Sequence, residues 1–123
     1  ADIKKINSSQ RISRKKISLL VSNSFIHHLL CIDDFFGCIE TLSSEKTINF
    51  HKDLIRPKDK KTALKLKAKC SEKYSYILTN DYYASLKASY RKNEIEDKIL
   101  QNKLYSLKVI EDTEEYLIVY GKV

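Results

Sequence analysis

The sequence predicts a small α+β domain with the element order β-α-β-β-α-β-β, in which two helices pack on one face of a small sheet. A chain of 123 residues that is 42% hydrophobic is long enough to bury one core. Residues 62–69 alternate between apolar side chains and lysines, as a strand with one buried face does. Residues 80–104 contain no glycine or proline and many helix formers, which predicts a helix.

The chain begins with a basic segment that has little to bury. Residues 1–14 predict an N-terminal arm that is disordered until it binds a partner, and residues 15–123 then form a single domain. Residues 16–22, KISLLVS, are apolar and predict the first strand. Residues 33–44 predict the first helix, with Asp33 or Asp34 as its N-cap.

The middle of the chain predicts a loop followed by a hairpin. Residues 46–61 contain the only proline and read as a long basic loop. The strands of the hairpin are residues 62–69 and 74–79, joined by the turn CSEK. The lysines of the first strand then form one cationic face of the sheet.

The last part of the chain predicts a helix and a second hairpin. Asn80 or Asp81 is available to cap the helix of residues 80–104, and a bend near Asn93 is expected because the apolar residues do not form one stripe. After it, two apolar strands flank the turn EDTEE and end the domain.

The charge of the chain is positive and uneven. Residues 1–92 contain 19 Lys and Arg against 9 Asp and Glu, a net charge of +10, whereas residues 93–123 contain 4 against 7, a net charge of −3. Several basic runs in separate elements favour a polyanionic partner, and nucleic acid is the commonest one. No apolar run reaches the roughly 18 residues that a membrane span needs, so no membrane partner is expected.

Metal binding and catalysis have weak support in the sequence. The three cysteines are irregularly spaced and form no CxxC pair, so His27, His28 and Cys31 are a poor match to a zinc site. The adjacent carboxylates Asp33 and Asp34 are explained more simply by helix capping. We therefore expect a protein that is not an enzyme, with no catalytic residue, metal or cofactor.

Residues 15–123 resemble a known family, the eukaryote-specific large-subunit ribosomal proteins called L-twenty-two of the eukaryotic type. KISLLVS and DDFFGCIETL occupy the places of the family's first strand and first helix. The closest part is NKLYSLKVIEDTEEYLIVYGKV. The matching positions in that part are Asn102, Leu104, Leu107, Lys108, Val109, Glu115, Tyr116 and Tyr120. The family's tryptophan and acidic tail are absent here, so the resemblance is to a shortened and divergent member.

The family's basic second helix fits this chain in two places. SEKYSYILTNDYY, residues 71–83, copies part of its pattern letter by letter, but this placement removes the second strand of the predicted hairpin. Placing the helix at residues 82–100 keeps that strand and is the placement we prefer. Lys87, Arg91 and Lys92 then supply its charge.

The resemblance implies a structural constituent of the large ribosomal subunit, located in the cytoplasm and assembled in the nucleus. Its partners would be the ribosomal RNA of that subunit and neighbouring ribosomal proteins, and the lysines of the hairpin would form part of the RNA-facing surface. The residues expected to bind RNA are Arg11, Arg14, Lys15, Lys16, Arg56, Lys58, Lys60, Lys61, Lys87, Arg91 and Lys92. Tyr82, Tyr83 and Tyr90 are candidates for stacking on unpaired bases.

Two other functions stay open at the level of sequence. One is a free-standing RNA- or DNA-binding regulator. The other is a small Mg²⁺-dependent nuclease that uses Asp33, Asp34 and Glu40, although the two aspartates lie beside the predicted helix cap.

Overall fold

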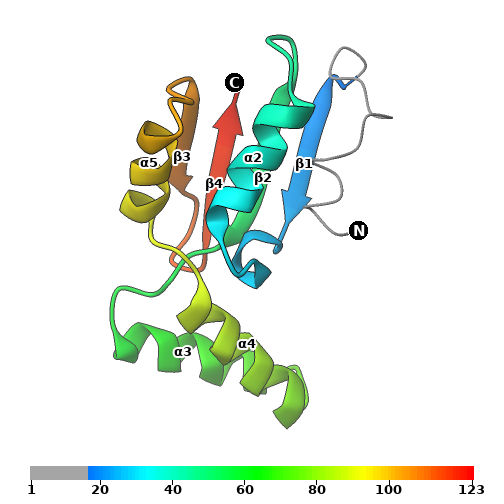
Figure 1. The fold of residues 1–123 in the computed structure, drawn as a ribbon. Coiled ribbons are helices and arrows are strands. Elements are labelled where there is room, and N and C mark those ends of the chain that lie inside the picture. The colour runs from blue at the N-terminus through cyan, green and yellow to red at the C-terminus, as the bar shows by residue number, and fades with distance from the viewer. Residues whose placement is uncertain (1–16) are drawn as a thin grey trace.

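The computed structural model describes residues 17–123, and the predicted N-terminal arm of residues 1–14 lies outside this range. The elements follow one another as shown in Figure 1. They are β1 (Leu19–Asn23), the short 3-10 helix η2 (Ile26–His28), α2 (Ile32–Leu42), β2 (Ile48–Leu54), α3 (Lys60–Ser71), α4 (Tyr76–Ala88), α5 (Lys92–Gln101), β3 (Leu107–Glu111) and β4 (Tyr116–Gly121).

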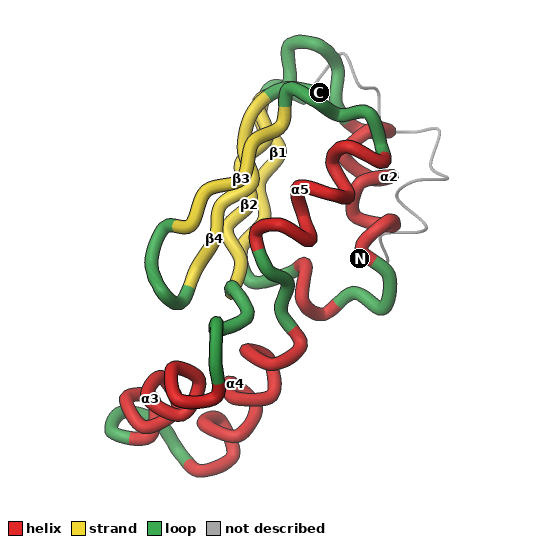
Figure 2. The backbone as a smooth tube through the Cα atoms, turned by 90° about the vertical axis from the view of Figure 1, so that its left-hand side faces the viewer, coloured by secondary structure: helices red, strands yellow, loops and turns green. Residues whose placement is uncertain are grey.

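The four strands form one mixed sheet in the order β1-β2-β4-β3. β1 runs parallel to β2, and β4 is antiparallel to both of its neighbours. Helices α2 and α5 lie on one side of the sheet, and within residues 17–123 the other face has no helix stacked over its centre (Figure 2). The predicted α+β class, with two helices on one sheet face, is confirmed.

The main core lies between the sheet and these two helices. Phe36 and Ile39 of α2, Ile95 of α5, and Leu117 and Val119 of β4 are each no more than 1% exposed. The strand residues alternate between this core and the opposite face, and the helix residues follow a helical spacing. The core therefore depends on the two periodicities that make the elements recognisable in the sequence.

The central strand β2 turns polar side chains toward this core. Asn49, His51 and Asp53 are each no more than 2% exposed. The carboxylate of Asp53 accepts a hydrogen bond from the backbone N–H of Phe25 at 2.8 Å and lies 2.6 Å from Nδ1 of His27. These bonds attach the β1–α2 connection to the sheet and satisfy a carboxylate that burial would otherwise destabilise.

The predicted hairpin of residues 62–69 and 74–79 is wrong, because both stretches lie in helices. They belong to α3 and α4, which lie side by side and extend beyond the sheet (Figures 1 and 2). The carboxylate of Asp59 accepts a hydrogen bond from the backbone N–H of Thr62 at 2.7 Å, so Asp59 caps α3. Ser75 caps α4 in the same way.

Burial along α3 follows a helical period and not the alternation seen in the sequence. Ala63 and Leu66, three residues apart, are buried, whereas Leu64 is 44% exposed. Apart from Thr62, α3 contains no β-branched residue, and its alanines, leucines and lysines are strong helix formers. Propensity and capping therefore outweigh a short alternating pattern.

Two other elements differ from the expectation. Residues 46–61, expected to be a loop, contain the long central strand β2. The expected helix of residues 80–104 is two helices, because α4 ends at Ala88 and α5 begins at Lys92. The interruption lies just before the bend that we expected near Asn93. There the backbone N–H of Arg56 donates to the carbonyl of Tyr90 at 3.1 Å.

The expected caps are also partly wrong. Cys31 is the N-cap of α2 and makes no side-chain capping bond, and Asp33 and Asp34 lie in the first turn of the helix. Asn80 and Asp81 lie inside α4 and do not begin a helix. The negative charge of the two aspartates still stabilises the N-terminus of α2 through the helix dipole.

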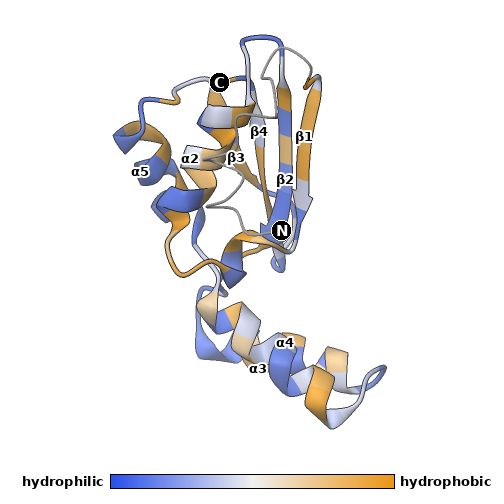
Figure 3. Ribbon diagram, turned by 45° about the vertical axis from the view of Figure 1, so that its right-hand side comes forward, coloured by the Kyte–Doolittle hydropathy of each residue, from blue (hydrophilic) through white to orange (hydrophobic). Residues whose placement is uncertain are grey.

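A smaller apolar cluster joins α3 and α4 to the rest of the fold. Leu54 of β2, Leu66 of α3 and Leu86 of α4 are buried together, with Tyr82 and Tyr116 packed against them. Polar and apolar segments alternate along these two helices (Figure 3). None of the helices within residues 17–123 has the length and apolar character needed to cross a membrane.

Candidate nucleic-acid interface

The positive charge of the chain is concentrated on α3 and its flanks. Residues 56–73 contain eight Lys and Arg against two Asp and Glu, which gives a net charge of +6, compared with +7 for the whole chain. One of the two acids, Asp59, is the cap of α3, and the N–H of Thr62 lowers the pKa of its carboxyl group. Helix α3 lies at the end of the molecule away from the C-terminus (Figure 1).

Three lysines form a stripe along the exposed side of α3. Lys61, Lys65 and Lys69 are spaced four residues apart, so their side chains lie on one side of the helix. All three are exposed. Lys65 lies 3.1 Å from a carboxylate oxygen of Glu114, but both side chains are about half exposed, so solvent weakens this pair.

Two further lysines hold a tyrosine between them. The ammonium groups of Lys67 on α3 and Lys87 on α4 lie 4.7 Å and 4.4 Å from the ring centre of Tyr83. These cation–π contacts link the two helices and fix the positions of both charges. Lys87, one of the residues predicted to bind RNA, therefore belongs with the charges of α3.

A groove of about 880 Å³ separates α3 from the open face of the sheet. Its cations are Lys52, from β2, and Lys69 and Lys73, from α3 and the turn after it. Its other lining residues include the carboxylates Glu72, Glu114 and Glu115 and the aromatic side chains Tyr74 and Tyr116. In Figure 2, α3 projects beyond the sheet on the side of the uncovered face.

The floor of the groove is held by a bond between α4 and the β3–β4 turn. The hydroxyl of Tyr82 donates a hydrogen bond to a carboxylate oxygen of Glu115. Burial and this bond raise the pKa of Tyr82, so its phenol stays protonated and remains a donor. The bond fixes the position of α4 relative to the sheet and leaves the lysines of α3 exposed.

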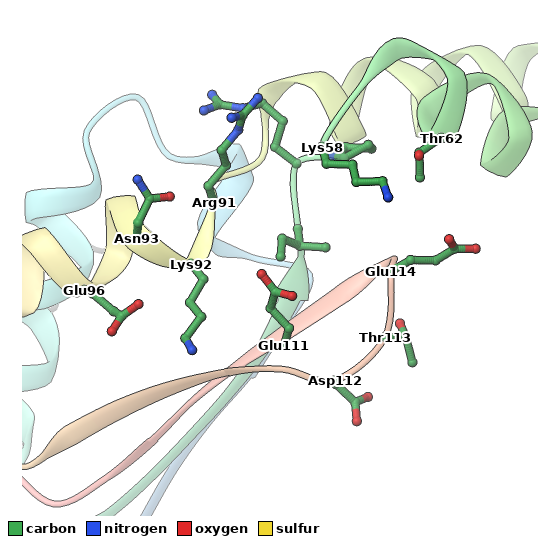
Figure 4. A pocket seen from close by; sticks show the side chains of 13 residues that line it. Lys58, Thr62, Arg91, Lys92, Asn93, Glu96, Glu111, Asp112, Thr113 and Glu114 are labelled. Atoms are coloured by element: carbon green, nitrogen blue, oxygen red, sulfur yellow. The ribbon is translucent and has the colours of Figure 1, made fainter.

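A second cleft, of about 620 Å³, contains four of the residues predicted to bind RNA (Figure 4). These are Arg56, Lys58, Arg91 and Lys92. The same cleft is lined by four carboxylates: Glu96, Glu111, Asp112 and Glu114. The cleft therefore carries equal numbers of both charges and attracts polyanions less than α3 does.

Glu94 engages Arg56 of this mixed-charge cleft through its side chain and Arg91 through its backbone. One carboxylate oxygen of Glu94 accepts a bond from the guanidinium of Arg56 at 2.7 Å and from the backbone N–H of Arg91 at 2.8 Å. In the bond to Arg91, the Glu94 carboxylate in the first turn accepts from the backbone N–H of the N-cap residue and so caps the start of α5. Arg56 therefore has a structural role at the junction between β2 and α5.

The other predicted residues fall into two groups. Lys60 and Lys61 begin α3 and continue its cationic surface. Arg11, Arg14, Lys15 and Lys16 lie outside the described residues. Tyr90, a predicted stacking residue, forms a bridge to Ile55 at the start of α5, and burial raises its pKa.

The carboxylates of the nuclease hypothesis do not form a cluster. Among residues 17–123, no group of three His, Cys, Asp or Glu side chains is placed to hold a metal ion. Asp33 pairs with Lys98 of α5 at 3.2 Å. His27 is engaged with Asp53, while Cys31 donates to Asp33.

Sequence reasoning missed the residues that β2 contributes, because that strand was expected to be a loop. Phe50 and Lys52 alternate with the buried Asn49, His51 and Asp53, so they lie on the open face of the sheet. The alternation was present in the sequence. It was masked because the buried positions are polar, whereas a strand is normally recognised by buried apolar residues.

Comparison with models of protein families and with curated proteins found no match to this chain.

Proposed function

We propose that this chain is an RNA-binding protein and, as the family resemblance implies, a structural constituent of the large ribosomal subunit. The observation that carries the proposal is the net charge of +6 in residues 56–73, most of which fold into α3. The partners are then the ribosomal RNA of that subunit and neighbouring ribosomal proteins. The location is the cytoplasmic ribosome, after assembly in the nucleus.

A rigid cationic helix suits this role physically. Folded RNA is recognised largely through its phosphates, its 2′-hydroxyls and its shape, so lysines at fixed spacing are sufficient for binding. The stripe of Lys61, Lys65 and Lys69 supplies that spacing. Asp59 caps α3, and the Tyr82–Glu115 bond holds the neighbouring helix α4 against the β3–β4 turn. Neither interaction uses these lysines.

Two matched double variants test the proposal. Lys61→Gln with Lys69→Gln removes two charges from the stripe. Lys46→Gln with Lys103→Gln removes two exposed charges from loops at the other end of the molecule (Figure 1). Binding to large-subunit ribosomal RNA is measured as a function of salt for both.

The stripe variant is expected to bind more weakly and to reduce the slope of log affinity against log salt by about 1.4–1.8, because about 0.7–0.9 is lost per phosphate contact. The control is expected to retain the slope of the unmodified protein. Equal effects of the two variants would contradict the proposal. Sedimentation of the protein with large subunits after a high-salt wash tests the ribosomal assignment separately and distinguishes it from a free-standing regulator.

A further inference from the structure

The face of the sheet opposite α2 and α5 combines aromatic, aliphatic and lysine side chains. In strand positions it presents Leu19, Val21, Ile48, Phe50, Lys52, Lys108, Ile110, Tyr116, Ile118 and Tyr120. None of these positions carries a carboxylate. Phe50 is 44% exposed, which is high for a large aromatic side chain on a central strand.

Two aromatic residues lie next to each other at the centre of this face. Phe50 of β2 is directly opposite Tyr120 of β4 in the register of the two central strands. Tyr120 is in turn opposite Lys108 of β3. A recess of about 380 Å³ at the edge of β3 is lined by Tyr120 and Lys108 together with residues of α5, among them Glu96 and Leu100.

A second lysine lies beside the aromatic pair on the other side. Lys52 is two residues from Phe50 on the same face, and its ammonium group lies 4.4 Å from the ring centre of Tyr116. It also lies 3.7 Å from a carboxylate oxygen of Asp112, a pair that is about 40% exposed and therefore weak. Lys52 lines the groove that leads to Lys69 and Lys73 of α3.

We propose that this open face binds unpaired RNA nucleotides, with two adjacent bases stacked on Phe50 and Tyr120 and the backbone phosphates on Lys108 and Lys52. Aromatic rings stack on any base, and flanking lysines attract the phosphates between them. The groove connects this face to α3, so one RNA strand can contact both. The inference rests on the proposed RNA-binding function and extends it to unpaired nucleotides.

A polyanion fits this face better than a second copy of the chain. A symmetric dimer through this surface would bury Lys52 and Lys108 of both copies, which places four lysines in one interface where, among the ion pairs of residues 17–123, only the weak Lys52–Asp112 pair offsets their charge. RNA instead supplies a negative charge for each lysine and a flat apolar surface for each ring. Charge complementarity therefore favours RNA over a second copy of the chain on this face of the sheet.

The experiment uses the full chain with two probes, a single-stranded oligoadenylate and a fully paired RNA duplex of the same length. Phe50→Leu and Tyr120→Leu are each expected to weaken oligoadenylate binding about 5- to 150-fold, because they remove a stacking ring. The salt slope is expected to stay the same, because no charge is lost. Duplex affinity is expected to change less than twofold for either variant.

Two controls separate stacking from loss of structure. Tyr120→Phe keeps the ring and is expected to retain oligoadenylate affinity. Leu19→Ala removes an exposed apolar side chain of β1 that is not next to the aromatic pair, and it is also expected to retain affinity. Thermal unfolding of each variant checks that the fold is intact, and leucine at both aromatic positions preserves most of the apolar area.

The possible outcomes distinguish this inference from the proposed function. If the leucine variants retain oligoadenylate affinity while Lys61→Gln with Lys69→Gln loses RNA affinity, the stacking surface is wrong and the RNA-binding function stands. If none of these variants affects RNA binding, both are wrong. If sedimentation equilibrium shows a dimer that Leu19→Ala and Phe50→Leu dissociate while RNA affinity is unchanged, the face is a dimer interface instead.

Discussion

His51 lies in the core on β2 and has a hydrogen-bond partner at each ring nitrogen. Nδ1 is 2.8 Å from the hydroxyl of Ser22, and Nε2 is 3.1 Å from the side-chain oxygen of Asn49. The amide of Asn49 donates to Ser43 at 3.0 Å, which leaves its oxygen facing the imidazole. A neutral imidazole with its proton on Nε2 satisfies this series of hydrogen bonds. Burial lowers the pKa of His51 to about 4.

The low pKa of His51 predicts a loss of stability in acid. The unfolded chain takes up a proton near pH 6.5, whereas the folded chain resists protonation down to about pH 4. The free energy of unfolding should therefore be unaffected by this residue above pH 6.5 and should fall as the pH drops from 6.5 to 4, by up to about 3 kcal/mol.

The matched variants for this prediction are His51→Gln and His28→Gln. Glutamine keeps one donor and one acceptor but does not titrate, so urea unfolding of His51→Gln should show a shallower dependence on pH than the unmodified protein. His28 is exposed, and its replacement should leave most of the dependence in place. Parallel pH profiles for the unmodified protein and His51→Gln would show that His51 is not the group that titrates.

At the scale of the elements, the sequence predicted the helices and strands whose buried residues are apolar and recur with the period of that element. The first strand, the first helix and the final hairpin were predicted within a few residues. Helix α5 was predicted as part of a longer helix, because nothing in the residues around Ser89 marks the bridge between Ile55 and Tyr90 that interrupts it. That bridge is a tertiary contact, which local propensity does not encode.

Helix α3 and strand β2 were missed for opposite reasons. In α3 the alternation of leucines and lysines resembles a strand, although the helix cap at Asp59 and the helix-forming composition favour the observed structure. In β2 the buried positions are polar, and only their hydrogen bonds in the folded protein make burial acceptable. Capping was readable in the sequence, whereas the partners of His51 and Asp53 were not.

Residues 82–100 were preferred over 71–83 as the counterpart of the family's basic helix because that placement kept the predicted hairpin. The hairpin does not form, so this reason no longer holds. Residues 71–83 include Lys73 and the first half of α4, so both placements are now helical for most of their length. Residues 56–73 carry a net charge of +6 and overlap the start of residues 71–83, whereas Arg91 and Lys92 line a cleft that also holds four carboxylates. The structure therefore removes the obstacle to the letter-by-letter placement.

This comparison gives a prediction for two double variants that each remove two charges. Lys69→Ala with Lys73→Ala should weaken RNA binding and incorporation into the large subunit more than Arg91→Ala with Lys92→Ala, because Lys69 and Lys73 lie on the strongly cationic segment. Both lysines are exposed, so thermal stability should change by less than about 0.5 kcal/mol. A larger loss for the Arg91 and Lys92 variant would restore the placement at residues 82–100.

For the molecule as a whole, the acidic and basic parts of the sequence lie in different regions of the structure. Residues 17–55 contain two Lys and five Asp and Glu, a net charge of −3, and residues 93–123 also have a net charge of −3. These segments form the sheet together with α2 and α5, whereas residues 56–73 carry +6 and project beyond the sheet (Figure 1). The electrostatic field of the described residues therefore favours the approach of a polyanion toward α3.

A lysine-acetylation footprint tests this orientation without any mutation. The protein is acetylated briefly, alone and bound to large-subunit ribosomal RNA, and the modification of each lysine is measured by mass spectrometry. Lys61, Lys69 and Lys73 should be protected, because a bound phosphate shields the amine from the reagent. Lys46 and Lys103, which lie in loops at the opposite end, should keep their reactivity (Figure 1). Protection of Lys46 and Lys103 with unchanged reactivity on α3 would mean that RNA binds the other end of the molecule and that local charge does not set the orientation.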